Sequence, residues 1–339
     1  MKTISTTNAI QMMAWLTVLL LTVAMPSMAQ RKKRIMKQDT SINNLVHPPG
    51  YQTMPIHQIG KVQKFGGGPQ EVILIAGLGL ASDKVFAQFI KDNSSKYTMY
   101  AITLAGYGGT QAYPMPPAGT SYAELTWHKH SQKVILGLMK KYNLKKPVII
   151  TNSQTPTLIG LRIALEHPEK IKAIVAIGGE LVRKLAPQKL TPKQRQMGID
   201  VQMAPMWFKT VTGETWDSNM WDDLVYSSNA QNGKRLSDEI NAVPVPNLLR
   251  YMIEHWAYDV TTELDKLKVP VLAIAPGFSK ALDDLYPEAS KRFYRTAYID
   301  TWKPAGDKVK VVVVKNAGVF VHQDQPAKVN QLVEEFIKR

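Results

Sequence analysis

The chain contains no cysteine and is short of acidic residues. Its 339 residues carry 42 Lys and Arg against 27 Asp and Glu, a formal net charge of +15. The absence of cysteine excludes disulfides, a thiolate nucleophile and a cysteine-ligated metal. The excess of basic residues could favour anionic surfaces such as lipid headgroups or nucleic acid. Because we see no nucleic-acid motif and no platform of interleaved aromatic and basic residues, we expect no nucleic-acid partner.

Long apolar runs are equally scarce, and the clearest one lies at the N-terminus. It extends from Met12 to Val23 and is interrupted only by Thr17 and Thr22. About a dozen apolar residues are too few to cross a bilayer comfortably but suit a secretory signal peptide. We therefore predict a signal peptide over residues 1–29 and an exported protein, periplasmic or secreted.

A basic segment follows this apolar run. Arg31 to Arg34 are four consecutive positive charges, and Lys37 adds a fifth. We interpret residues 30–50 as a flexible basic leader, the only segment for which we expect possible membrane contact. Positive charge directly after an apolar run resists export, so an uncleaved membrane anchor stays open as the alternative.

Strand-like and helix-like segments alternate through most of the remaining chain. Apolar runs such as Val72 to Ile75, Val148 to Ile150 and Ala173 to Ile177 are typical of buried strands, and helical spacing follows them. The pattern predicts an α/β protein with a mostly parallel central sheet covered by helices on both faces. Ile56 to Phe65 alternates like a hairpin. On the helix expected over residues 122–142, we interpret His128 and His130 as surface histidines.

The most informative stretch runs from Lys146 to Ile171. A short strand breaks at Thr151-Asn152-Ser153-Gln154-Thr155, and a helix begins at once. This layout resembles the nucleophile elbow of the α/β-hydrolase family, Gly-x-Ser-x-Gly, with threonine at both small positions. The turns at Ala76 to Gly79 and Ala105 to Thr110 resemble two further turns of the family. The resemblance implies Ser153 as nucleophile, with the N–H groups of Leu78 and Gln154 as the oxyanion hole.

The rhythm of strands and helices is lost between residues 181 and 265. The resemblance implies a helical cap at this place, between core segments 51–180 and 266–339. An aromatic-rich cap would line an apolar pocket, for which the candidates are Trp207, Phe208, Trp216 and Trp221. These residues could equally form the cap's own core.

The family's remaining catalytic positions are altered. The segment from Asn316 to Pro326 resembles its Gly-His-Phe…Gln-Pro stretch, but Val319 stands where the histidine is expected. The turn at Phe278-Ser279, where the aspartate is expected, carries no acid. His322, three residues after Val319, could supply a relocated base if the segment is helical. Glu180 or Asp283 could supply the acid.

Two hypotheses of different classes remain open. The first is an exported serine hydrolase that acts on an ester-like acyl substrate with an apolar part through Ser153, with no cofactor or metal. The second is a catalytically inactive homologue that uses the capped pocket to bind a small apolar ligand or a protein partner. A serine hydroxyl needs a base within hydrogen-bond reach, so the position of His322 decides between them.

Overall fold

The computed structural model describes residues 60–182, 185, 189–212, 222–285 and 295–338. Its centre is a seven-stranded sheet with the order β1-β3-β2-β4-β5-β6-β7. Only β1 runs antiparallel to its neighbour, and the other neighbouring strands pair in parallel. The strands are β1 (Lys61–Gly66), β2 (Gln70–Ile75), β3 (Tyr97–Thr103), β4 (Val148–Asn152), β5 (Ala173–Ile177), β6 (Val271–Gly277) and β7 (Val309–Lys315).

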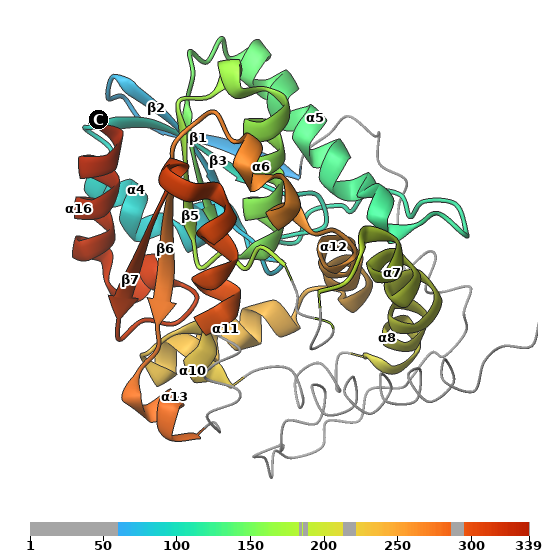
Figure 1. Cartoon of the computed structure of the whole chain (residues 1–339). Coiled ribbons are helices and arrows are strands. Elements are labelled where there is room, and N and C mark those ends of the chain that lie inside the picture. The colour runs from blue at the N-terminus through green and yellow to red at the C-terminus, as the bar shows by residue number, and fades with distance from the viewer. Residues whose placement is uncertain (1–59, 183–184, 186–188, 213–221, 286–294, 339) are drawn as a thin grey trace, which may run out of the picture.

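Helices cover both faces of this sheet. In Figure 1 the sheet lies between one pair formed by α4 (Ala87–Asn93) and α16 (Pro326–Ile337) and another formed by α5 (Thr126–Lys141) and α6 (Gln154–Glu166). Shorter helices complete the core: α3 (Ser82–Val85), η1 (Tyr122–Glu124), η2 (Pro168–Lys170), η4 (Val260–Lys266), α13 (Lys280–Leu285), η5 (Asp300–Lys308) and α15 (Val321–Asp324). The mostly parallel sheet with helices on both faces confirms the predicted fold class.

Burial explains why these strands read as continuous apolar runs. All five residues of β4 and of β5 are buried, as are Val72 to Ile75 in β2. A parallel sheet covered on both faces has no solvent side, so its central strands need not alternate. Strand β1 pairs with β3. The first strand of the predicted hairpin, residues 56–59, lies outside the described residues. The predicted signal peptide and leader lie outside them too.

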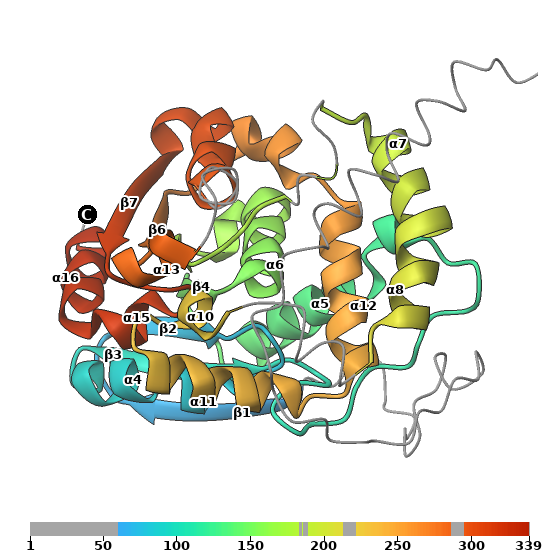
Figure 2. The same ribbon diagram turned by 90° about the horizontal axis from the view of Figure 1, so that it is seen from below.

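Further helices occur among the described residues between β5 and η4. They are α7 (Pro192–Met197), η3 (Gly198–Met203), α8 (Ala204–Thr210), α10 (Asp223–Tyr226), α11 (Ala230–Asn241) and α12 (Val245–Ala257). Figure 2 shows α12 between α6 and the outer pair α7 and α8. We call this set the cap helices; the predicted limits of the cap, residues 181 and 265, stay predictions.

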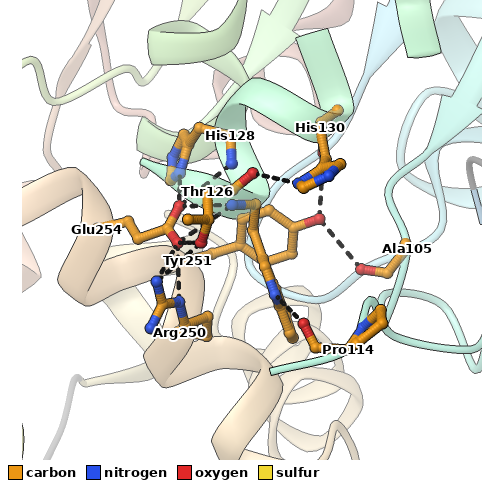
Figure 3. Close-up of polar contacts among 10 residues, drawn as sticks. Ala105, Pro114, Thr126, His128, His130, Arg250, Tyr251 and Glu254 are labelled. Atoms are coloured by element: carbon orange, nitrogen blue, oxygen red, sulfur yellow. Dashed lines mark hydrogen bonds and ion pairs between the residues drawn. The ribbon is translucent and has the colours of Figure 1, made fainter. Parts of the chain in front are cut away.

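A buried carboxylate joins the cap helices to the core (Figure 3). Glu254 of α12 accepts hydrogen bonds from the backbone N–H groups of Trp127 and His128, at 3.1 and 3.2 Å, and from the Thr126 hydroxyl at 2.7 Å. Helix α5 has no side-chain cap of its own, because Leu125 occupies that position. Glu254 therefore replaces the missing cap from another helix.

Arg250 and His128 complete this cluster. The Nε of Arg250 donates to Glu254 at 2.8 Å, and the His128 Nδ1 lies 2.9 Å from the same carboxylate. Burial alone would raise the pKa of Glu254, but His128 and Arg250 outweigh it and lower that pKa to about 2. The interpretation of His128 as a surface histidine is wrong: its side chain is fully buried, because this carboxylate 126 residues away gives it a partner.

Candidate functional site

Ser153 lies at a strained turn between β4 and α6. Its backbone has φ 73° and ψ 178°, a region that a residue with a side chain rarely occupies. Such strain costs on the order of 1–3 kcal/mol and persists only where the surroundings enforce it. The Ser153 N–H donates to the carbonyl of Ile177 at 2.9 Å, and its carbonyl accepts from the Thr157 hydroxyl at 2.7 Å. The predicted elbow geometry is present.

Thr151 and Thr155 stand at the two positions where glycine was expected, and both hydroxyls have hydrogen-bond partners. Thr151 Oγ1 lies 2.9 Å from Thr157 Oγ1 and is fully buried. Thr155 makes a side-chain hydrogen bond with Tyr107, whose pKa is raised chiefly by burial. A glycine is needed instead at Gly77, whose backbone lies close to Ser153: an added Cβ would be 2.9 Å from the Ser153 Cβ.

The predicted oxyanion-hole residues both border the same cavity as Ser153. Gln154 is the first residue of α6, so its N–H belongs to the unpaired set at a helix N-terminus. Leu78 has φ 54° in the turn after β2. Two backbone donors of this kind suit a carbonyl oxygen or an oxyanion, and they do not depend on the side chains.

The cavity itself is small, at about 20 Å³. That volume accommodates about one water molecule. Its wall mixes a hydroxyl and a carboxylate with aromatic and aliphatic groups. The lining residues are Leu78, Ser153, Gln154, Gly178, Glu180, Tyr226, Met252, Tyr298 and Val319.

Val319 occupies this wall in a fixed position. The Asn152 side-chain amide donates to the Val319 carbonyl at 3.0 Å, and the Val319 N–H donates to Val225 at 2.8 Å. An added Cβ on Gly178, which has φ 57°, would lie only 2.3 Å from the Val319 carbonyl oxygen. The side chain of Val319 is 3% exposed. An aliphatic side chain therefore lines the cavity at this point, and contacts with Asn152, Val225 and Gly178 fix its backbone.

The structure does not bring His322 to Ser153. The His322 Nε2 lies 3.1 Å from the carbonyl of Val85, and the ring stacks on Phe86 with centroids 4.7 Å apart. It is not among the residues that line the Ser153 cavity. The relocated-base hypothesis assumed helical spacing from Val319, but α15 begins only at Val321, so the helical rule does not apply.

Burial also makes His322 a poor base. It lowers the pKa of His322 to about 4, although the hydrogen bond to Val85 acts in the opposite direction. The ring therefore carries no proton near neutral pH and contributes by packing. His322 thus lies against Val85 and Phe86 and not in the wall of the Ser153 cavity.

The two candidate acids differ in position. Glu180 lines the cavity and is 2% exposed. Burial lowers the pKa of the nearby Arg195 in α7, and the negative charges of Asp259 and Glu180 only partly oppose this. Asp283 lies exposed on α13 and does not line the cavity. The structure thus brings Glu180 to Ser153 and leaves Asp283 outside. At the turn after β6, Phe278 packs against Tyr298, with ring centroids 6.2 Å apart.

The cap aromatics that the structure describes serve packing. Trp207 meets Trp256 edge to face, with centroids 4.9 Å apart, and Phe208 stacks on Tyr122 at 6.0 Å. Neither lines the cavity, where the cap contributes Met252 and Tyr226 instead. Trp216 and Trp221, the other two pocket candidates, lie outside the described residues. Methionine and tyrosine at these positions carry no sequence signal that separates them from ordinary core residues.

No imidazole reaches the serine from the described part of the chain. Five of the seven histidines are described, and none of the five lines the cavity. They are His128, His130, His167, His255 and His322. Among the residues that the structure describes, no group of three or more His, Asp or Glu side chains could hold a metal ion.

Known structures with the same architecture share the chain's overall path. A hydrolase from Oleispira antarctica superposes with a TM-score of 0.56 at 14% identity, covering 84% of this chain and 96% of the other. A bromoperoxidase from Bacillus anthracis gives 0.55 at 14%, covering 82% and 95%. An enol-lactonase from Burkholderia xenovorans LB400 gives 0.52 at 14%, covering 82% and 96%. The chain has the α/β-hydrolase fold.

No family model matches this sequence, and no curated protein sequence matches it either. At 14% identity the structural likeness establishes the α/β-hydrolase fold alone, and fold does not determine function. What the site can do must therefore be argued from Ser153 and the groups around it.

Proposed function

We propose that this α/β-hydrolase-fold protein binds a small, uncharged carbonyl compound at Ser153 without hydrolysing it. The observation that carries the proposal is Val319, an aliphatic side chain held against the cavity where hydrolysis needs a base. A serine hydroxyl is a weak nucleophile without such a base. General-base assistance typically contributes 10²–10⁴-fold to a rate, so its absence favours binding over turnover.

The retained parts of the site are those that recognise an oxygen atom. Leu78, Gln154 and Ser153 line one cavity that accommodates about one water molecule, and their N–H groups and hydroxyl are the donors that we assign to a ligand oxygen there. A ligand oxygen in that place could accept hydrogen bonds as a water molecule would. Met252 and Val319 supply apolar contacts beside it. A lactone or ester with an apolar tail has this chemistry, and the structurally similar enol-lactonase takes a lactone by its printed name.

The test uses γ-butyrolactone as the probe, a small lactone of which the carbonyl oxygen is the part that the cavity admits. We expect calorimetry to detect its binding and chromatography to find the lactone ring intact after long incubation. Ser153→Ala should weaken binding by roughly two- to tenfold, since a net hydrogen bond contributes about 0.5–1.5 kcal/mol. Ser279→Ala, on the turn after β6, is the matched control and should bind like the wild type. Ring opening that depends on Ser153 would refute the proposal, and so would an absence of binding.

The strained serine supports a second candidate, slow acyl transfer at Ser153. The φ of 73° is kept despite its cost, and Glu180 shares the cavity as a carboxylate that could accept a proton. A fluorophosphonate probe distinguishes the two candidates. The binding proposal expects no labelling of the wild type above Ser153→Ala. Labelling that disappears in both Ser153→Ala and Glu180→Gln would favour the second candidate.

We also propose that the protein is exported. The apolar run from Met12 to Val23 and the small residues before Gln30 support this. In a Gram-negative host, cell fractionation should recover the protein outside the cytoplasm, and N-terminal sequencing should begin at Gln30. A protein that begins at Met1 in the membrane fraction would favour the anchored alternative.

A further inference from the structure

The outermost cap element is a helical run with two unlike faces. Helices α7, η3 and α8 follow one another without a break from Pro192 to Thr210. Figures 1 and 2 both show α7 and α8 on the side of α12 that faces away from the sheet. Ile199, Met203 and Trp207 are buried, and Trp207 packs on Trp256 of α12. One face of the run is therefore occupied by the protein's own core.

The opposite face exposes apolar side chains. Met197 is 57% exposed and Val201 69%, the two highest values among the large apolar side chains of the described residues. They lie four residues apart and so share a face, and Pro205, four residues further, is also exposed. Single exposed apolar residues are ordinary, but a continuous row on an outer helix is typical of a contact surface.

The charged residues at the two ends of this apolar row are both positive. Lys193 and Lys209 are exposed at its two ends, each four residues from the nearest member. The one acidic residue between positions 189 and 212, Asp200, is half-buried and accepts a hydrogen bond from the Tyr122 N–H at 2.9 Å. We call Lys193, Met197, Val201, Pro205 and Lys209 the outer stripe. Its apolar centre and positive ends complement a surface that has an apolar interior and an anionic outer layer.

We propose that the outer stripe docks onto an anionic lipid surface. Apolar side chains on such a helix enter the boundary between headgroups and acyl chains, while lysines reach the phosphates with their charged ends. The chain's net charge of +15 attracts the whole molecule to the same surface, and the basic residues from Arg31 to Lys37 add to it. Such contact is peripheral, and no described helix is long and apolar enough to cross a bilayer.

The absence of cysteine allows a direct test of orientation. In the processed protein, Val201→Cys introduces a single thiol that can carry an environment-sensitive fluorophore. Vesicles of equal parts phosphatidylglycerol and phosphatidylcholine should shift its emission to the blue, and pure phosphatidylcholine should not. Leu285→Cys, 45% exposed on α13, is the matched control and should show no shift. High salt should weaken both the shift and vesicle binding, since it screens charge.

Co-sedimentation with the same vesicles separates the stripe from the basic leader. We expect Met197→Asp with Val201→Asp to lower partitioning at least about tenfold, because these variants lose apolar burial. Lys193→Gln with Lys209→Gln should lower it roughly tenfold or more, since each lysine near an anionic surface contributes about 1 kcal/mol. Leu285→Asp should leave it unchanged. Vesicle binding without a shift at position 201 would overturn the proposal, as would a shift that follows protein concentration in the absence of lipid.

Discussion

Replacing Val319 by histidine tests the central claim about the site most directly. The backbone at this position is held by Asn152 and Val225, so the Cβ of a new side chain would keep its place in the cavity wall. Ser153 and Glu180 line the same cavity. An imidazole there would meet a hydroxyl and a carboxylate, the three groups that acyl transfer at a serine requires.

The size of the effect follows from what the imidazole adds. A general base contributes typically 10²–10⁴-fold, which is about 3–5 kcal/mol of activation free energy. The larger ring must also fit a site where valine is 3% exposed, and overpacking of this kind costs typically 1–3 kcal/mol of stability. We therefore expect a folded but less stable protein whose Ser153 reacts at least 100-fold faster with a fluorophosphonate.

The assay measures the labelling rate of Val319→His across pH. The rate should rise with pH through the imidazole's titration, because only the neutral ring accepts a proton. Val319→Gln, similar in size but without a titratable group, should label no faster than the wild type. Adding Ser153→Ala to Val319→His should abolish labelling. If folded Val319→His is labelled no faster than Val319→Gln, the low reactivity of Ser153 is not caused by the missing base alone, and the claim is refuted.

Three further predictions concern stability, each measured by urea unfolding. Because the folded state lowers the pKa of His322 from 6.5 to about 4, the unfolded chain binds the proton more tightly, and stability should fall as pH drops from 6.5 towards 4. The loss attributable to this ring is about 3 kcal/mol at full protonation, and His322→Gln should remove that pH dependence. Glu254→Gln should cost about 3–5 kcal/mol, since it leaves the buried guanidinium of Arg250 facing an amide; an unchanged midpoint would contradict the capping role. The pKa of Glu254 is lowered, so in the wild type its contribution should be present above about pH 4.5 and lost towards pH 2. Gly178→Ala should destabilise the protein by more than 1 kcal/mol, because its φ is positive and the added Cβ would press on the Val319 carbonyl; a stability equal to the wild type would show that this turn can move.

Most of the fold is readable from the sequence because its central strands are buried on both faces. Val72 to Ile75 and Ala173 to Ile177 are apolar without interruption, and each is followed by a turn and a helical pattern. The elbow was predictable for the same local reason, since strand, serine and helix are adjacent in the chain. The family resemblance implied Leu78 and Gln154 as oxyanion-hole residues, and both line the cavity.

The rest depends on contacts between distant residues, which local spacing does not encode. The helical argument from Val319 to His322 failed because the chain is not yet helical at Val319. The burial of His128 follows from Glu254, 126 residues away. The role of Asn152 as an anchor for Val319 spans 167 residues. Each of these needs the tertiary structure, because the sequence gives only residue type and order.

The borrowed cap of α5 has a consequence for how the molecule can be divided. The first turn of that helix is completed by a carboxylate from a segment that precedes β6, so the sheet layer and the inserted helices are not separable modules. Excising the insertion would remove the acceptor of the first N–H groups of α5 and expose the buried side chains of Trp127 and His128 to water. We therefore expect the sheet with its covering helices and the cap helices to unfold together as one cooperative unit.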